Sequence, residues 1–193
     1  MSIKIGKYEI PHPIIQGGMG VGISWDRLAG TVSALGGLGT ISSVGTGYYQ
    51  NCRFAKHLKE GRPLGAMSTF SREALFEIFR NARKICGNAP LACNILHVIT
   101  DYKRVVKDAI DAGANIIVTG AGLPTDLAKL VEGHDDVAIV PIVSSGKALK
   151  VIARFWQRAG RLPDAVIVEG PLSGGHQGVP KEDLENPAHS LEA

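Results

Sequence analysis

The sequence has no marked excess of either charge. Its 193 residues contain 21 Lys and Arg against 18 Asp and Glu, which gives a formal net charge of +3 at pH 7. The basic residues are also interrupted by acidic or apolar ones, whereas nucleic-acid binding needs a concentrated basic surface. The charge pattern therefore argues against a nucleic-acid partner.

Long hydrophobic runs are missing as well. No apolar segment approaches the roughly 20 residues that a membrane-spanning helix needs. Residues 1–4 do not lead into a hydrophobic signal segment. We therefore expect no membrane association, and the cytoplasm is the default location.

Cysteine is scarce. Cys52, Cys86 and Cys93 make an odd count without C-x-x-C spacing, which argues against a disulfide scaffold and against a zinc site. No two histidines have the spacing of metal ligands on a helix. We expect no metal, and a reducing compartment fits this cysteine usage.

Glycine, in contrast, is abundant, with 24 residues in a chain that is 45% hydrophobic. The glycines show no three-residue period, so collagen is excluded, and the apolar content excludes low-complexity disorder. A chain of this length can bury a substantial core as one domain. The glycines are thus expected at turns and close backbone approaches of a compact fold.

Short apolar segments alternate with glycine-marked turns and amphipathic helices. Strands are predicted at residues 13–16, 38–41, 91–96, 116–119, 137–143 and 165–168. Most of them begin about two dozen residues apart, as βα units do. The second and third are further apart, which predicts an extra excursion at residues 43–70. Because the strands are continuous apolar runs, we expect a parallel sheet buried on both faces.

Serines are predicted to cap the first two helices. Ser24 would precede a helix that buries Leu28, Val32 and Leu35, and Ser71 would begin the next one. The second helix carries apolar residues at three- and four-residue steps, as a buried helix face requires.

Two arrangements can hold such βα units, a barrel or a doubly wound sheet. Glycine and small polar residues follow every predicted strand, which favours a TIM (β/α)8 barrel, since a doubly wound sheet concentrates them at one switch point. Only about six of the eight units are present. We expect one α/β domain over residues 1–193, incomplete at its C-terminus, whose open edges contact a second copy of the chain in a homo-oligomer or a missing C-terminal segment.

The segment from Glu169 to Gly178 carries the strongest functional signal. His176 is flanked by glycines in the loop after the sixth predicted strand, and imidazole titrates near neutrality, which suits a general base. Glu169, at the strand's end, can accept hydrogen bonds from cofactor hydroxyls.

Two further motifs have both a functional and a structural interpretation. The glycines of residues 16–20 would let the backbone approach a flat ring or a phosphate, or they form an ordinary tight turn. Asn94 is an amide near the end of an apolar strand. It would bind a ligand there, or satisfy neighbouring backbone groups.

Taken together, these motifs resemble the FMN-dependent nitronate monooxygenases, whose superfamily includes the flavin-dependent enoyl-ACP reductases. The resemblance rests on residues 13–19, 36–39, 94–96, 119–124 and 169–178, in that order. It implies a TIM barrel that binds FMN at its C-terminal mouth. It also implies an oxidoreductase that converts alkyl nitronates and O2 to carbonyl compounds and nitrite.

By this resemblance His176 would be the catalytic residue. The cofactor would be bound by Gly17, Gly18, Met19, Asn94, Glu169, Gly174 and Gly175. In barrels of this kind the phosphate lies at the loops after strands seven and eight, so its site is expected beyond Ala193. We therefore expect the 193-residue chain by itself to bind FMN weakly.

Two alternatives stay open. One is an NAD(P)H-dependent enoyl-ACP reductase acting on an enoyl thioester. The reductases tend to have an acidic residue where this chain has residues 171–173, Pro-Leu-Ser, so the resemblance favours the monooxygenase. The other alternative is a non-catalytic barrel fragment or partner subunit, which the short length supports and the intact Gly175-His176 pair opposes.

Overall fold

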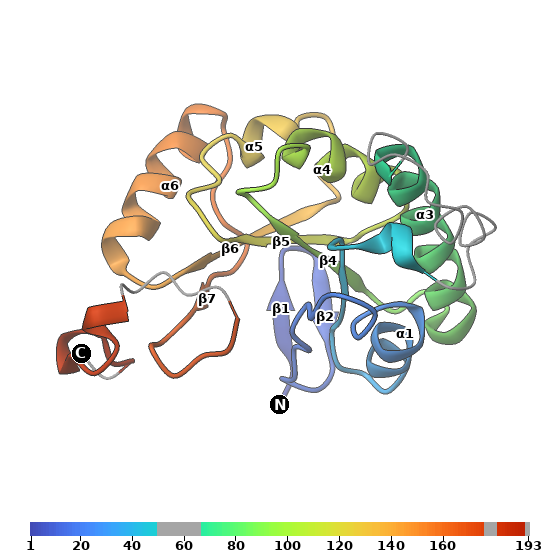
Figure 1. The fold of residues 1–193 in the computed structure, drawn as a ribbon, viewed down its shortest axis with the longest axis horizontal. Coiled ribbons are helices and arrows are strands. Elements are labelled where there is room, and N and C mark those ends of the chain that lie inside the picture. The colour runs from blue at the N-terminus through green and yellow to red at the C-terminus, as the bar shows by residue number, and fades with distance from the viewer. Residues whose placement is uncertain (50–66, 176–180, 192–193) are drawn as a thin grey trace.

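A curled parallel β-sheet forms the centre of the molecule. The computed structural model describes residues 1–49, 67–175 and 181–191. Its sheet has five strands in the order β3-β4-β5-β6-β7, each parallel to its neighbour (Figure 1). The strands are β3 (Gly39–Ser42), β4 (Leu91–Leu96), β5 (Ile116–Gly120), β6 (Ala138–Val143) and β7 (Ile167–Val168). This confirms the predicted α/β fold, a partial TIM barrel.

Helices cover the convex face of the sheet (Figure 1). They are α1 (Asp26–Ala34), α3 (Met67–Cys86), α4 (Tyr102–Asp111), α5 (Leu127–Leu130) and α6 (Gly146–Arg158), of which α1 packs on α3 and β3 at one edge. Three short 3-10 helices complete the described chain: η1 (Thr46–Tyr48), η3 (Lys181–Asp183) and η4 (Pro187–His189). No helix in these ranges combines the length and the apolarity that a membrane crossing requires.

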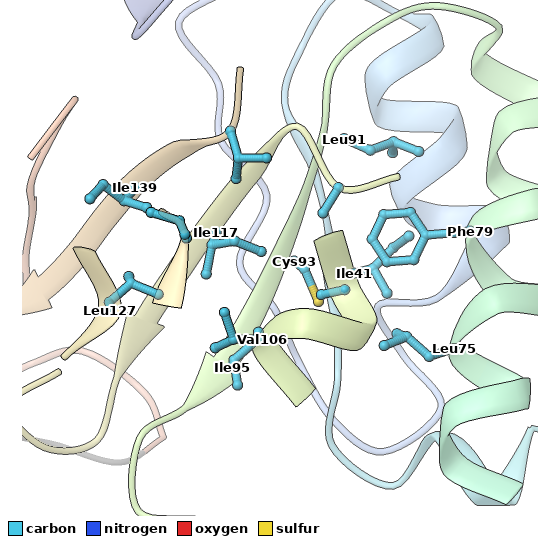
Figure 2. Packing of buried hydrophobic residues seen from close by; sticks show 14 of the residues in the cluster. Ile41, Leu75, Phe79, Leu91, Cys93, Ile95, Val106, Ile117, Leu127 and Ile139 are labelled. Carbon is cyan, nitrogen blue, oxygen red and sulfur yellow. The ribbon is translucent and has the colours of Figure 1, made fainter. Parts of the chain in front are cut away.

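The main core lies between the sheet and these helices (Figure 2). Alternate residues of the strands point into it, since successive side chains of a strand face opposite sides. The strands contribute Ile41, Leu91, Cys93, Ile95, Ile117 and Ile139, and the helices contribute Leu75, Phe79, Val106 and Leu127. This layer fixes the positions of the strand ends that carry the site.

A second apolar cluster lies on the concave face, under an antiparallel hairpin that the sequence analysis did not predict. The hairpin consists of β1 (Ile3–Ile5) and β2 (Tyr8–Ile10). Its buried Ile5 and Ile10 join Ala92, Ile116 and Ala138 of the sheet. The hairpin thereby covers one end of the concave face, on which Figure 1 shows it.

The first predicted strand, residues 13–16, is reduced to a single bridge between Ile15 and Leu38. Around it, Leu38 N–H donates to Ile14 O and Gln16 N–H donates to Leu38 O, both at 2.9 Å. The segment therefore runs parallel to the start of β3 but does not extend the sheet.

Both predicted serine caps are wrong. The N-cap of α1 is Trp25, and the Ser24 hydroxyl donates instead to Gly17 O at 2.9 Å. Ser71 lies inside α3, which begins at Met67. Ser24 thus lies one residue before the cap of α1, and Ser71 lies within the helix that it was predicted to begin.

The predicted buried face of α1 is only partly right, because Leu28 and Val32 are half-buried and Leu35 lies beyond the last helical residue. Leu35 is 71% exposed, whereas Ala29, Gly30 and Ser33 are buried. The reason is the close packing of α1 on α3: a Cβ at position 30 would lie 3.0 Å from Ala82 O. Small residues, not leucines, therefore face the neighbouring helix.

The predicted excursion at 43–70 falls largely outside the described residues, which cover 43–49, with η1, and 67–70, at the start of α3. The extent of the domain stays a prediction.

Candidate functional site

A pocket of about 1370 Å³ opens where the parallel strands end. Main-chain glycines and apolar side chains make up most of its wall. All seven residues predicted to bind a cofactor line it: Gly17, Gly18, Met19, Asn94, Glu169, Gly174 and Gly175. The carboxyl ends of neighbouring parallel strands meet at one edge, which explains how segments so far apart in the sequence converge. Their proposed roles in binding stay a prediction.

Asn94 and Gly18 connect the sheet to the first loop. Asn94 Nδ2 donates to Gly18 O at 3.2 Å, and its backbone oxygen accepts from Ser43 N–H at 3.1 Å. Because the Gly18 carbonyl can only accept, the Asn94 amide nitrogen must face it. The amide oxygen Oδ1 is left buried, without a hydrogen-bond partner among the described residues.

Gln16 and Ser24 shape the loop of residues 17–23. The Gln16 side chain accepts from Thr40 N–H at 3.1 Å and donates to Thr40 O at 3.3 Å, to Ser24 Oγ at 2.6 Å and to Gly17 O. Ser24 Oγ also accepts from Met19 N–H at 2.9 Å. These bonds hold Gly17 to Met19 at the pocket wall. The sequence analysis named neither side chain for this role, although both are polar residues within or beside apolar segments.

The opposite wall begins where β7 ends. Glu169 N–H donates to Val143 O at 2.9 Å, which continues the pairing of β6 with β7 by one residue. Gly170 packs so closely that a Cβ there would lie 2.8 Å from Leu191 Cγ. Gly175 has φ +90°, a conformation that favours glycine, and no atom of the described residues lies within 4 Å of its Cβ position. Among the described residues, this wall therefore leaves open space beside Gly175, and Glu169 lines the same pocket.

The pocket suits a flat, polar-edged cofactor. Its apolar wall can cover a ring, and bare glycine backbone lets a ring approach closely. The buried Asn94 Oδ1 offers an acceptor that a ligand N–H or O–H would satisfy. The residues present thus fit a flavin.

Comparison with known proteins identifies the family. The family model for nitronate monooxygenase matches residues 1–193. The chain belongs to the nitronate monooxygenase family. This confirms the resemblance found in the sequence. No curated protein matches the chain.

Solved structures related to this family share the fold. FabK from Thermotoga maritima is 30% identical with a TM-score of 0.62, and the match covers 88% of this chain and 44% of that one. Its M276A variant gives the same identity and TM-score. Nitroalkane oxidase from Streptomyces ansochromogenes is 20% identical with a TM-score of 0.56, and coverage is 90% of this chain and 51% of that one. The chain thus spans about half the length of these proteins.

His176, the predicted catalytic residue of this nitronate monooxygenase family member, lies outside the described residues. The described residue that precedes it is Gly175, at the pocket wall. His97, which directly follows β4, is not among the residues that line the pocket. It contacts the outer layer instead, with Nε2 3.8 Å from Asp126 Oδ1 and its ring against Tyr102. Burial raises the pKa of the Tyr102 phenol.

Within the described part of the chain, no group of three or more His, Cys, Asp and Glu side chains could hold a metal ion.

Proposed function

We propose that this chain forms the flavin-binding part of an FMN-dependent nitronate monooxygenase, which converts alkyl nitronates and O2 to carbonyl compounds and nitrite. The observation that carries the proposal is the family match over residues 1–193. The pocket supports it, because the residues that the family resemblance assigns to FMN line one cavity at the strand ends.

In this proposal the chain holds the flavin from two walls. Gly17, Gly18 and Met19 present backbone groups on the side of the first loop, while Gly174 and Gly175 flank the ring from the other wall. Asn94 Oδ1 accepts a hydrogen bond, and the Glu169 carboxylate accepts from cofactor hydroxyls. When bound, FMN supplies the redox chemistry with the nitronate and oxygen, whereas the protein supplies position and electrostatics.

His176 is the proposed catalytic residue. In the sequence it directly follows Gly175, which lines the pocket, and it precedes Gln177. An imidazole there takes a proton from a nitroalkane, or positions the nitronate by a hydrogen bond. The apolar side chains of the pocket, such as Val118 and Ile142, would lie against the alkyl part of a small substrate.

A second candidate function is NAD(P)H-dependent reduction of an enoyl thioester. The observation in its favour is the greater identity with FabK, a flavin enoyl-ACP reductase, than with nitroalkane oxidase, 30% against 20%. The family match favours the monooxygenase.

Two measurements on the FMN-loaded protein separate these functions. Under anaerobic conditions, addition of NADH or NADPH should leave the flavin absorbance unchanged, and in air a nitronate should release nitrite. Rapid bleaching by NAD(P)H without nitrite release would instead establish the reductase. If neither reaction occurs while flavin is bound, the chain is a non-catalytic binding unit or a partner subunit.

A further inference from the structure

Thr40 is a buried threonine in the pocket with an unused hydroxyl. It lies in β3, is 2% exposed and lines the cavity. Its backbone is fully engaged, because Gln16 bonds to both its N–H and its carbonyl oxygen. Its Oγ1 nevertheless has no hydrogen-bond partner among the described residues. Leaving a buried hydroxyl unpaired costs stability.

A second buried threonine shows how the sheet ordinarily satisfies such a group. Thr119 in β5 is fully buried, and its Oγ1 donates to Ile95 O at 2.9 Å. Thr119 faces the helices, whereas Thr40 faces the cavity. On the concave side, β5 and β6 carry Val118 and Val140, which have nearly the shape of threonine without its hydroxyl. The hydroxyl at position 40 is therefore not required for packing.

Asn94 presents a second unpaired atom on the same wall. Ser42 of β3 pairs with Asn94 of β4, so Thr40, two residues before Ser42, has its side chain on the same face as Asn94. Gly18 O occupies the amide nitrogen of Asn94, and Oδ1 has no partner among the described residues. Two adjacent strands thus place one hydroxyl and one amide oxygen on one wall of the pocket, both without partners among the described residues.

We propose that the Thr40 hydroxyl is a ligand-binding group that, together with Asn94 Oδ1, hydrogen-bonds the flavin. This inference rests on the proposed function. The Thr40 hydroxyl can donate or accept a hydrogen bond, and Asn94 Oδ1 can only accept one. Together they suit a ligand group that carries an N–H or O–H donor. A flavin has two such groups, the imide of its ring and the hydroxyls of its ribityl chain.

The test is flavin affinity, measured by fluorescence titration of the full chain with FMN, riboflavin and lumiflavin. Thr40→Val keeps the shape and should weaken FMN binding about tenfold, as loss of a hydrogen bond from a buried group does. Thr40→Ser, which keeps the hydroxyl, should stay within about threefold of the unmodified chain. Lumiflavin lacks the ribityl chain, so weaker lumiflavin binding in Thr40→Val assigns the bond to the ring imide. An effect confined to riboflavin and FMN assigns it to a ribityl hydroxyl.

Thermal unfolding without flavin separates binding from structure. Thr40→Val should unfold at the same temperature as the unmodified chain or higher, because no protein bond is lost. Thr119→Val, the matched control, should lower the unfolding temperature because it breaks the bond to Ile95 O, and should keep flavin affinity.

Unchanged flavin affinity in Thr40→Val overturns the inference, as does a loss of unfolding temperature equal to that of Thr119→Val. The proposed function can fail separately. If Thr40→Val weakens FMN binding tenfold but the unmodified chain releases no nitrite from a nitronate, the flavin contact stands and the proposed reaction is wrong. If the unmodified chain binds none of the three flavins, both proposals fall.

Discussion

Gly18 lies so close to Asn94 that a Cβ at position 18 would be 2.3 Å from Asn94 Cβ. The contact joins the first loop to β4, and the Asn94 side chain donates to Gly18 O across it. Only a residue without a side chain permits this approach. The same contact fixes which way the Asn94 amide faces, and hence where its oxygen is offered in the pocket.

Gly18→Ala should destabilise the chain by about 1–3 kcal/mol, the usual cost of forcing an extra methyl group into a packed position. The methyl would push the loop away from β4 and break the bond from Asn94, and FMN affinity should fall as well. Gly17→Ala is the stability control, because no atom of the described residues lies within 4 Å of a Cβ there. Urea unfolding measures both variants. Equal unfolding free energies for the two would contradict the close contact.

Gly39→Ala should cost more, because the obstacle is backbone. A Cβ at position 39 would lie 1.8 Å from Ala29 O, where α1 crosses the start of β3. Relief requires a shift of the helix, so we expect a loss above about 4 kcal/mol, at the extreme of single substitutions. Circular dichroism and urea unfolding would measure it.

Gly146→Ala is the matched control for that substitution. Position 146 begins α6, and no atom of the described residues lies within 4 Å of its Cβ position. Alanine favours a helix over glycine by up to about 1 kcal/mol. The urea concentration at which half of the Gly146→Ala chain is unfolded should therefore equal that of the unmodified chain or exceed it. A folded Gly39→Ala chain with the stability of Gly146→Ala would disprove the tight packing of α1 on β3.

The sequence predicted the strands whose apolar runs are long and marked by glycine. The predicted ranges 91–96, 116–119 and 137–143 agree with β4, β5 and β6 to within about one residue. The N-terminal hairpin escaped because its two strands have three residues each, too few to show an alternating pattern. The buried face of α1 was predicted only in part because tight helix packing selects small residues, which hydrophobic periodicity does not register.

The residues that line the pocket were predicted where a motif marks them, and missed where only the tertiary structure brings them there. Asn94 stood out because an amide interrupts an apolar strand. Thr40 is likewise a polar residue within β3. Because threonine is common in strands, its presence there does not indicate a binding residue. Ser24 has the residue type of a helix cap, yet its hydroxyl serves the Gly17–Met19 loop, which only the tertiary structure reveals.

The thiol of Cys93 should not react with thiol reagents in the folded protein. Burial raises the pKa of its thiol, which therefore stays protonated, and the thiolate is the reactive form. In a Cys52→Ser/Cys86→Ser chain, a thiol reagent at pH 8 should label Cys93 only after unfolding in urea. Rapid labelling of the native chain would contradict this.

The same shift predicts how stability depends on pH. A thiol pKa that is higher in the folded state than in the unfolded state means that the unfolded chain loses its proton first. Stability from this group is thus complete below the ordinary thiol pKa, about 8.5, and declines as the pH rises above it. Cys93→Ala should remove that part of the decline, which urea unfolding between neutral and alkaline pH would measure.

His176→Asn should suppress nitrite release from a neutral nitroalkane, whose carbon-bound proton a base must remove, while the chain still binds FMN. Asparagine keeps a hydrogen-bonding side chain of similar size but cannot take up a proton near neutral pH, so loss of turnover with retained flavin separates the base from the cofactor site. We expect at least a hundredfold drop, the lower range for removal of a general base. His134→Asn is the control, since His134 is exposed in the connection between α5 and β6, before the strand and not after it. If the two variants release nitrite at the same rate, reduced or not, His176 is not the base. Another residue would then have to take up the proton.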